Sequence, residues 1–195
     1  LYNYTEGYGS YLIPAVMMII IFQTLLMVIG MVTGEEYSSD GIRTYAPFGH
    51  TWAAAIRIVA GKTFVYCGLY AIFSFFLLGL LPYFFSIPNI GNGLYIVLLM
   101  IPYLIATSFL GLAASRYFTD SEAPLLMIAF FSVGLIFLSG VSYPMELMPW
   151  YWKAAHYILP AAPATLAFVQ LNSMGASMAD IRPEYITLWI QVLVY

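Results

Sequence analysis

Residues 63–115 form an uninterrupted stretch of 53 residues without a single charged side chain. A helix needs about 20 predominantly apolar residues to cross a bilayer, so this stretch is long enough for two spans. The segment SIPNIGNG at residues 86–93 divides it with proline, asparagine and glycine, the residue types of turns. We therefore expect two membrane spans, at about 63–85 and 93–115.

The composition of the chain places these spans in a membrane. Of the 195 residues, 63% are hydrophobic and 8% are charged, whereas a soluble domain carries roughly 25% charged residues. We interpret the chain as an integral membrane protein. Its net charge is −3, with few and scattered basic residues, and nucleic-acid binding needs a basic patch or stripe. A nucleic-acid partner is therefore not expected.

Three further apolar stretches complete the predicted topology. Residues 11–33 and 123–141 carry no charge and suit a hydrocarbon layer about 30 Å thick, and residues 185–195 read as the first half of another span. We predict an all-α membrane protein, a single transmembrane domain over 1–195 with five transmembrane helices, the last truncated, of an expected six. The chain does not begin with methionine, and we interpret it as part of a longer protein. Because the orientation derived below puts residue 1 outside and no signal peptide is visible, we expect an earlier span before it.

The stretch at residues 142–168, SYPMELMPWYWKAAHYILPAAPATLAF, is apolar but broken by prolines. Proline inside a helix removes a backbone hydrogen bond and clashes with the preceding turn, which excludes one straight span. Tryptophan and tyrosine favour the membrane–water boundary. We predict a re-entrant helical hairpin with turns at Pro149 and Pro160. Trp150 and Trp152 are expected at headgroup depth. The residues assigned to this segment are Pro144, Glu146, Pro149, Trp150 and Pro160.

Residues 34–62 form the most polar loop, and we expect a short helix at 51–60 within it. Lysine and arginine gather on the cytoplasmic side of membrane proteins. This loop and residues 116–122 together hold four basic residues, whereas the opposite side holds two. We therefore place 34–62 in the cytoplasm and 142–168 outside.

Signatures of catalysis are missing from the sequence. It contains no G-x-x-x-x-G-K-[ST] phosphate loop and no H-E-x-x-H zinc motif. The predicted topology puts His50 and His156 on opposite sides of the membrane, so they cannot share a metal. Spans 11–33, 63–85, 93–115 and 123–141 hold none of the charged residues that ion-driven carriers usually place there. We expect no catalytic residue, no metal and no cofactor.

Two groups of residues resemble the type-2 permease family of ABC transporters. The first consists of Gly34-Glu35-Glu36, Asp40-Gly41-Ile42, Ala46-Pro47 and Gly61-Lys62. The second consists of Ser139-Gly140, Tyr143-Pro144, Met148-Pro149-Trp150 and Leu159-Pro160. The order of spans, polar loop and broken segment is similar to that of the family over essentially the whole chain.

The resemblance implies a membrane subunit of an exporter that works as a homo- or heterodimer of permeases in a bacterial cytoplasmic membrane. It implies two separate ATP-binding subunits as partners, and a periplasmic adaptor is a further candidate partner. The 34–62 loop would be the coupling element that sits in a groove of the ATPase. The residues that the resemblance places there are Glu35, Glu36, Gly41, Arg43, Pro47 and His50.

Two other functional hypotheses stay open at the level of the sequence. The chain could be a membrane scaffold or assembly protein without transport of its own, which would work without an ATPase partner. It could also be an intramembrane enzyme that uses Glu146 and His156 as an acid/base pair. Methionine- and aromatic-rich spans are more often plain packing than a substrate path, so the sequence carries no substrate signature.

Overall fold

The computed structural model of the chain describes residues 8–38, 52–85, 90–117, 122–143 and 145–195, without the side chains of 8–11, 37–38, 127, 129–131 and 146. These residues form helices and their connections, with no strand among them. The elements in order are α1 (Tyr8–Ser38), α2 (Trp52–Phe75), the π-helix η2 (Phe76–Leu80), α3 (Leu81–Phe84), α4 (Gly93–Ser115), α5 (Ala123–Leu138), the 3-10 turn η3 (Met145–Leu147), α6 (Trp150–Ile158), α7 (Ala161–Met174) and α8 (Arg182–Val194).

Three of the described helical segments are long and apolar enough to cross a membrane. They are Leu12–Glu36, Trp52–Phe84 and Gly93–Ser115. Helices α5 and α8, with 16 and 13 residues, are shorter than the ~20 that a span needs. The all-helical membrane fold is therefore confirmed for the described residues, whereas the count of five spans stays a prediction.

Helices extend into both ends of the polar loop that the sequence predicts over residues 34–62. Helix α1 continues to Ser38, and α2 starts at Trp52 and runs without interruption to Phe75. The short helix expected at 51–60 is thus the first part of a longer one. No proline separates it from the apolar residues that follow, and the single Gly61 costs a helix only about 1 kcal/mol. The remaining residues of the loop, 39–51, lie outside the described ones.

The segment at residues 142–168 is divided where the prolines predict. Helices α6 and α7 meet at 88°, with Pro149 and Pro160 directly before their first residues. Leu159 is extended, with φ −95° and ψ 123°, because a residue before proline is driven away from the α-helical region. The prediction of a broken segment with turns at Pro149 and Pro160 is confirmed.

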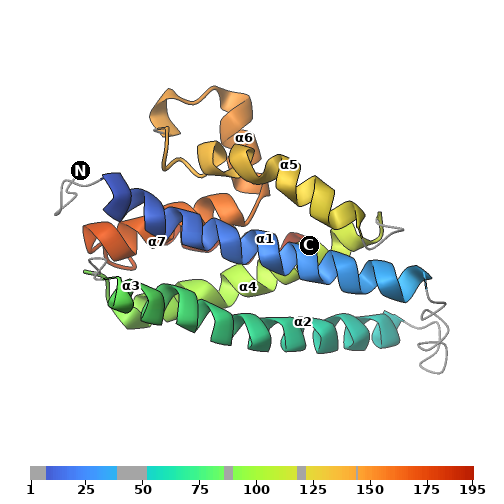
Figure 1. The fold of residues 1–195 in the computed structure, drawn as a ribbon. Coiled ribbons are helices and arrows are strands. Elements are labelled where there is room, and N and C mark those ends of the chain that lie inside the picture. Colours follow the sequence, from blue (N-terminus) through green and yellow to red (C-terminus); the bar gives the residue numbers. More distant parts are fainter. Residues whose placement is uncertain (1–7, 39–51, 86–89, 118–121, 144) are drawn as a thin grey trace.

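Helix α7 lies in the centre of the bundle rather than at its edge. Eleven of its 14 residues are buried, and it packs against α1, α4 and α8. Alanine is frequent along it, and small side chains let neighbouring helices approach closely inside a membrane. Figure 1 shows α7 alongside the N-terminal half of α1, with α6 projecting from the bundle.

Candidate functional site

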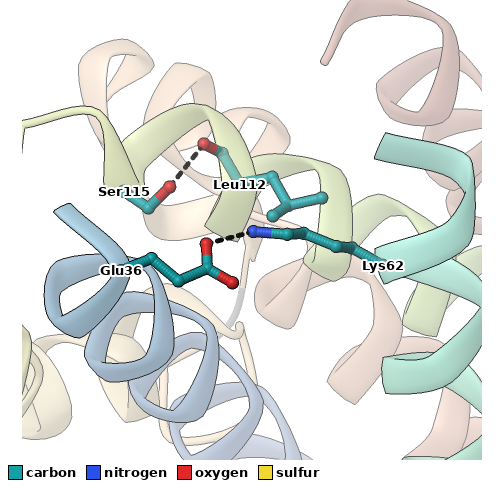
Figure 2. A network of polar contacts seen from close by, with 4 residues as sticks. All are labelled: Glu36, Lys62, Leu112 and Ser115. Atoms are coloured by element: carbon teal, nitrogen blue, oxygen red, sulfur yellow. Dashed lines mark hydrogen bonds and ion pairs between the residues drawn. The ribbon is translucent and has the colours of Figure 1, made fainter. Parts of the chain in front are cut away.

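The two helices that flank residues 39–51 are joined by an ion pair. Glu36, near the end of α1, accepts a hydrogen bond from the ammonium group of Lys62 in α2. Their side chains are 27% and 20% exposed, so both charges are half-buried. Figure 2 shows this pair between the two helices, with Ser115 and Leu112 of the last turn of α4 in the same view. The ion pair therefore joins the last turn of α1 to a position about three turns into α2, so these helices are held together by charge as well as by packing.

Lys62 is the residue of this site that the sequence interpretation did not assign. It stands 26 positions from Glu36, and no local periodicity links residues at that separation. The glycine–lysine pair Gly61-Lys62 was visible as a motif, but its ionic partner depends on how α1 and α2 pack. The pair therefore became visible only in three dimensions.

The other predicted coupling residues have different outcomes. Glu35 lies in the same turn of α1 as Glu36, and its side chain is exposed. Successive residues of a helix point about 100° apart, so the two carboxylates face different directions. Gly41, Arg43, Pro47 and His50 lie outside the described residues.

Aromatic and basic side chains gather at this end of the bundle. Trp52, the first residue of α2, is 88% exposed, and Arg57 one to two turns later is also exposed. After α4, the guanidinium carbon of Arg116 lies 5.7 Å from the ring centroid of Tyr117. Tryptophan with arginine and lysine is typical of a membrane–water interface on the cytoplasmic side.

The corner between α6 and α7 is held by side chains from α8. A helix that ends leaves its last carbonyl groups without backbone partners. The amide nitrogen of Gln191 donates a hydrogen bond to the carbonyl oxygen of Tyr157 at 2.8 Å, and the Tyr195 hydroxyl donates to that of Ile158. Backbone polar groups inside a membrane must find such partners, so the corner is built to lie within the bundle.

His156 connects the same corner to α5. Its side chain is fully buried, and its Nδ1 lies 2.8 Å from the carbonyl oxygen of Leu138. Because a carbonyl oxygen only accepts, Nδ1 carries the proton. Nε2 is buried without a hydrogen-bond partner among the described residues. The side chain of Glu146 lies outside the described part, so an acid/base pair with His156 stays a hypothesis.

The residues assigned to the outer segment separate into two environments. Trp150 is 80% exposed and packs edge-on against Tyr151 at 5.9 Å between ring centroids. Pro149 is exposed as well, whereas Pro160 at the corner is buried. Of the remaining two, Pro144 lies outside the described residues, and Glu146 is described only as part of the backbone of η3. Helix α6 thus presents an aromatic surface beside a buried corner.

The described residues contain no cluster of three or more histidine, cysteine, aspartate or glutamate side chains suited to hold a metal. What they do contain is an ion pair that joins α1 to α2, and a broken helical pair, α6 and α7, held by contacts with α5 and α8.

Comparison with models of protein families gives one match, to the family described as ABC-2 family transporter protein, over residues 1–195. The searches among curated proteins and among solved structures gave no significant match.

Proposed function

Because the chain belongs to the ABC-2 family of transporters, we propose that it is the permease subunit of an ATP-binding cassette exporter. Membership in this family carries a role as an integral membrane component of ABC transport, which generally has no enzymatic activity of its own. The observation that carries the proposal is the family match over every residue of the chain, together with the three clear membrane spans.

In the proposed complex, a partner subunit supplies the energy for transport, and the direction of transport is outward. A separate ATPase subunit hydrolyses ATP, and two permease subunits together enclose the path of an unidentified substrate. The complex stands in a bacterial cytoplasmic membrane and moves its substrate outward. A cytoplasmic position for the end of the bundle that carries Glu36 and Lys62 is supported by side chains typical of the membrane–water interface, namely Trp52, Arg57 and Arg116.

The Glu36–Lys62 pair supports a coupling role for the polar segment between α1 and α2. If the ATPase subunit binds at residues 34–62, a displacement there acts on both flanking helices. The ion pair makes α1 and α2 respond together, because separating them leaves two half-buried charges without their partners. A movement of the partner is then passed on as a movement of the α1–α2 pair.

Helix α1 is suited to carry that movement into the bundle. It packs against α4, α5 and α7, and the hydroxyl group of Tyr103 in α4 donates a hydrogen bond of 2.7 Å to the carbonyl oxygen of Met18 in α1. Because packed cores move as units rather than deform continuously, a shift of α1 also shifts α7. Since α7 leads into the corner with α6, the movement reaches the segment proposed to lie at the outer mouth.

Recovery of partners from native membranes tests the proposed function. The full-length protein, tagged and purified in mild detergent, is expected to bring down an ABC ATPase subunit in a fixed ratio, and ATP hydrolysis is expected in the purified complex. Function that persists after the ATPase gene is deleted would contradict the proposal and favour the scaffold hypothesis. Activity that persists without the ATPase and is lost in a His156→Ala variant that still folds would instead favour the enzyme hypothesis.

A further inference from the structure

An apolar crevice of about 550 Å³ lies between α2 and α4, toward the end of the bundle opposite the Glu36–Lys62 pair. Its back wall is buried and includes Ser74, Leu78 and Met100, and its rim is exposed and includes Phe75 and Val97. Its volume falls in the range of roughly 300–1,000 Å³ that is typical of small-molecule sites. The crevice is therefore large enough to hold a ligand, and it opens between exposed side chains of two membrane spans.

The local backbone explains why the crevice is not filled. Pro82 has no N–H group and its ring crowds the preceding turn, and the chain widens just before it into a π-turn in which the N–H of Leu81 bonds the carbonyl oxygen of Phe76. Two glycines also border the space. A Cβ atom at Gly93 would meet nothing within 4 Å, and one at Gly79 would meet only the ring of Phe75 at 3.9 Å. The space exists because the two glycines contribute no side chains to fill it.

The length of the crevice matches one leaflet of a bilayer. On α2 and η2 its lining runs from Cys67 to Gly79, and on α4 from Gly93 to Ile105. At 1.5 Å per residue each side is about 18 Å long, close to half of the ~30 Å hydrocarbon core. A ligand that fills the crevice thus lies parallel to the acyl chains of the surrounding lipid.

One polar group in the back wall has no partner. Ser74 is 5% exposed, and its hydroxyl makes no hydrogen bond with any described residue. Serine inside a membrane helix ordinarily bonds the carbonyl oxygen four residues earlier, and a buried hydroxyl without a partner is unfavourable. The hydroxyl of Ser74 is therefore a hydrogen-bond donor that no described residue uses, on a residue that lines the back wall of the crevice.

We propose that this crevice binds one acyl chain of a bilayer phospholipid, with an ester carbonyl of the lipid accepting a hydrogen bond from the Ser74 hydroxyl. The tail of the chain lies toward Cys67, and the headgroup lies beyond Gly79 and Gly93. The lipid is the occupant because the crevice opens between two spans, runs the depth of a leaflet and combines an apolar lining with one unsatisfied donor. The site is independent of the exporter role and of the identity of the exported substrate.

Photolabelling tests the proposal directly. The full-length protein is reconstituted in vesicles that contain phosphatidylcholine with a diazirine in its acyl chain, and the labelled peptides are mapped by mass spectrometry. We expect label to concentrate on 67–79 and 93–105. Gly79→Phe, which fills the crevice, is expected to lower this labelling at least fivefold. Gly68→Phe is the matched control, because Gly68 is an exposed glycine of α2 outside the crevice with nothing within 4 Å.

A second pair of measurements tests the contact with Ser74. Ser74→Ala is expected to lower labelling by the ester lipid about two- to tenfold, the effect of one lost hydrogen bond, while labelling by a diazirine-bearing alkane stays unchanged. Equal labelling of Gly79→Phe and wild type, or label spread evenly over all lipid-facing positions, would overturn the site. Labelling that is insensitive to Ser74→Ala would overturn the assigned contact. If Gly79→Phe does not fold, Ala71→Leu fills the same space.

Discussion

At the scale of single residues, two kinds of hydrogen bond hold helices together. Some join the backbones of two segments, and others join a side chain to a backbone carbonyl group at a helix end. Ile90 donates a backbone hydrogen bond of 3.1 Å to the carbonyl oxygen of Asn172, which joins the start of the α4 segment to the end of α7. Gly91 follows directly, and a Cβ atom there would lie 2.7 Å from the carbonyl oxygen of Leu171. The close approach of these two chains requires glycine.

Gly91→Ala is therefore expected to destabilise the protein by about 1–3 kcal/mol, the usual effect of overpacking against atoms that cannot move aside. The measurement is thermal unfolding of the purified protein followed by tryptophan fluorescence. Gly93→Ala is the control, since a Cβ atom there meets nothing within 4 Å. Equal unfolding temperatures for the two variants would contradict the contact between residues 90–91 and α7.

Gln191 provides a second prediction at this scale. Gln191→Leu removes the donor to the carbonyl oxygen of Tyr157 and leaves that oxygen without a partner, which costs about 1 kcal/mol or more. Thr187→Ala is the comparison in the same helix, because its hydroxyl only bonds the carbonyl oxygen of Pro183 four residues earlier. The same unfolding measurement should show a loss for Gln191→Leu and little change for Thr187→Ala; the reverse order would contradict the role of α8 in holding the corner.

At the scale of elements, prolines and uncharged stretches predicted where helices lie and break. The residues at which helices begin and end could not be predicted. The start of α6 followed from Pro149 and the break between α6 and α7 from Pro160, because proline acts on its own local backbone. The sequence pattern did not predict that α1 extends to Ser38 or that α2 starts at Trp52. Charged residues such as Glu36 and Lys62 end a hydrophobic stretch without ending a helix, so hydropathy places the limit of the apolar layer and not that of the helix.

Partners across the bundle were also beyond the reach of the sequence. Lys62 pairs with a residue 26 positions away, and Gln191 bonds one 34 positions away. These contacts arise from the approach of α1 to α2 and of α8 to the corner between α6 and α7. A single sequence shows which residues are polar, but the partner of each polar residue is set by tertiary structure.

The accessibility of cysteines tests whether α6 and α7 form a re-entrant hairpin or a broken span. In a cysteine-free background that includes Cys67→Ala, single cysteines replace Leu147 before α6 and Met174 at the end of α7, both exposed. A hairpin that enters and leaves on the outer side predicts that a membrane-impermeant maleimide labels both positions in intact cells. Trp52→Cys is the control and should react only after the membrane is permeabilised. Labelling of only one of the two positions in intact cells would indicate a span that crosses the membrane.

At the scale of the whole molecule, the proposed permease passes movement from one end of the bundle to the other. The Glu36–Lys62 pair joins α1 and α2, α1 packs on α7, and α7 meets α6 at a corner anchored by His156 and Gln191. Each of these contacts lies between helices rather than within one. The arrangement supports the proposed role of a membrane subunit that is moved by a separate ATPase.

The central claim is that force from a separate ATPase enters through α1 and α2, which the Glu36–Lys62 ion pair joins. ATP hydrolysis by the full-length permease–ATPase complex, reconstituted in lipid nanodiscs, tests it most directly. Glu36→Lys places two cations together and should lower the permease-dependent hydrolysis at least fivefold, and the exchange Glu36→Lys with Lys62→Glu should restore most of it because the pair reforms with reversed charges. Undiminished permease-dependent hydrolysis in Glu36→Lys, with the ATPase still bound in its normal ratio, would contradict the claim.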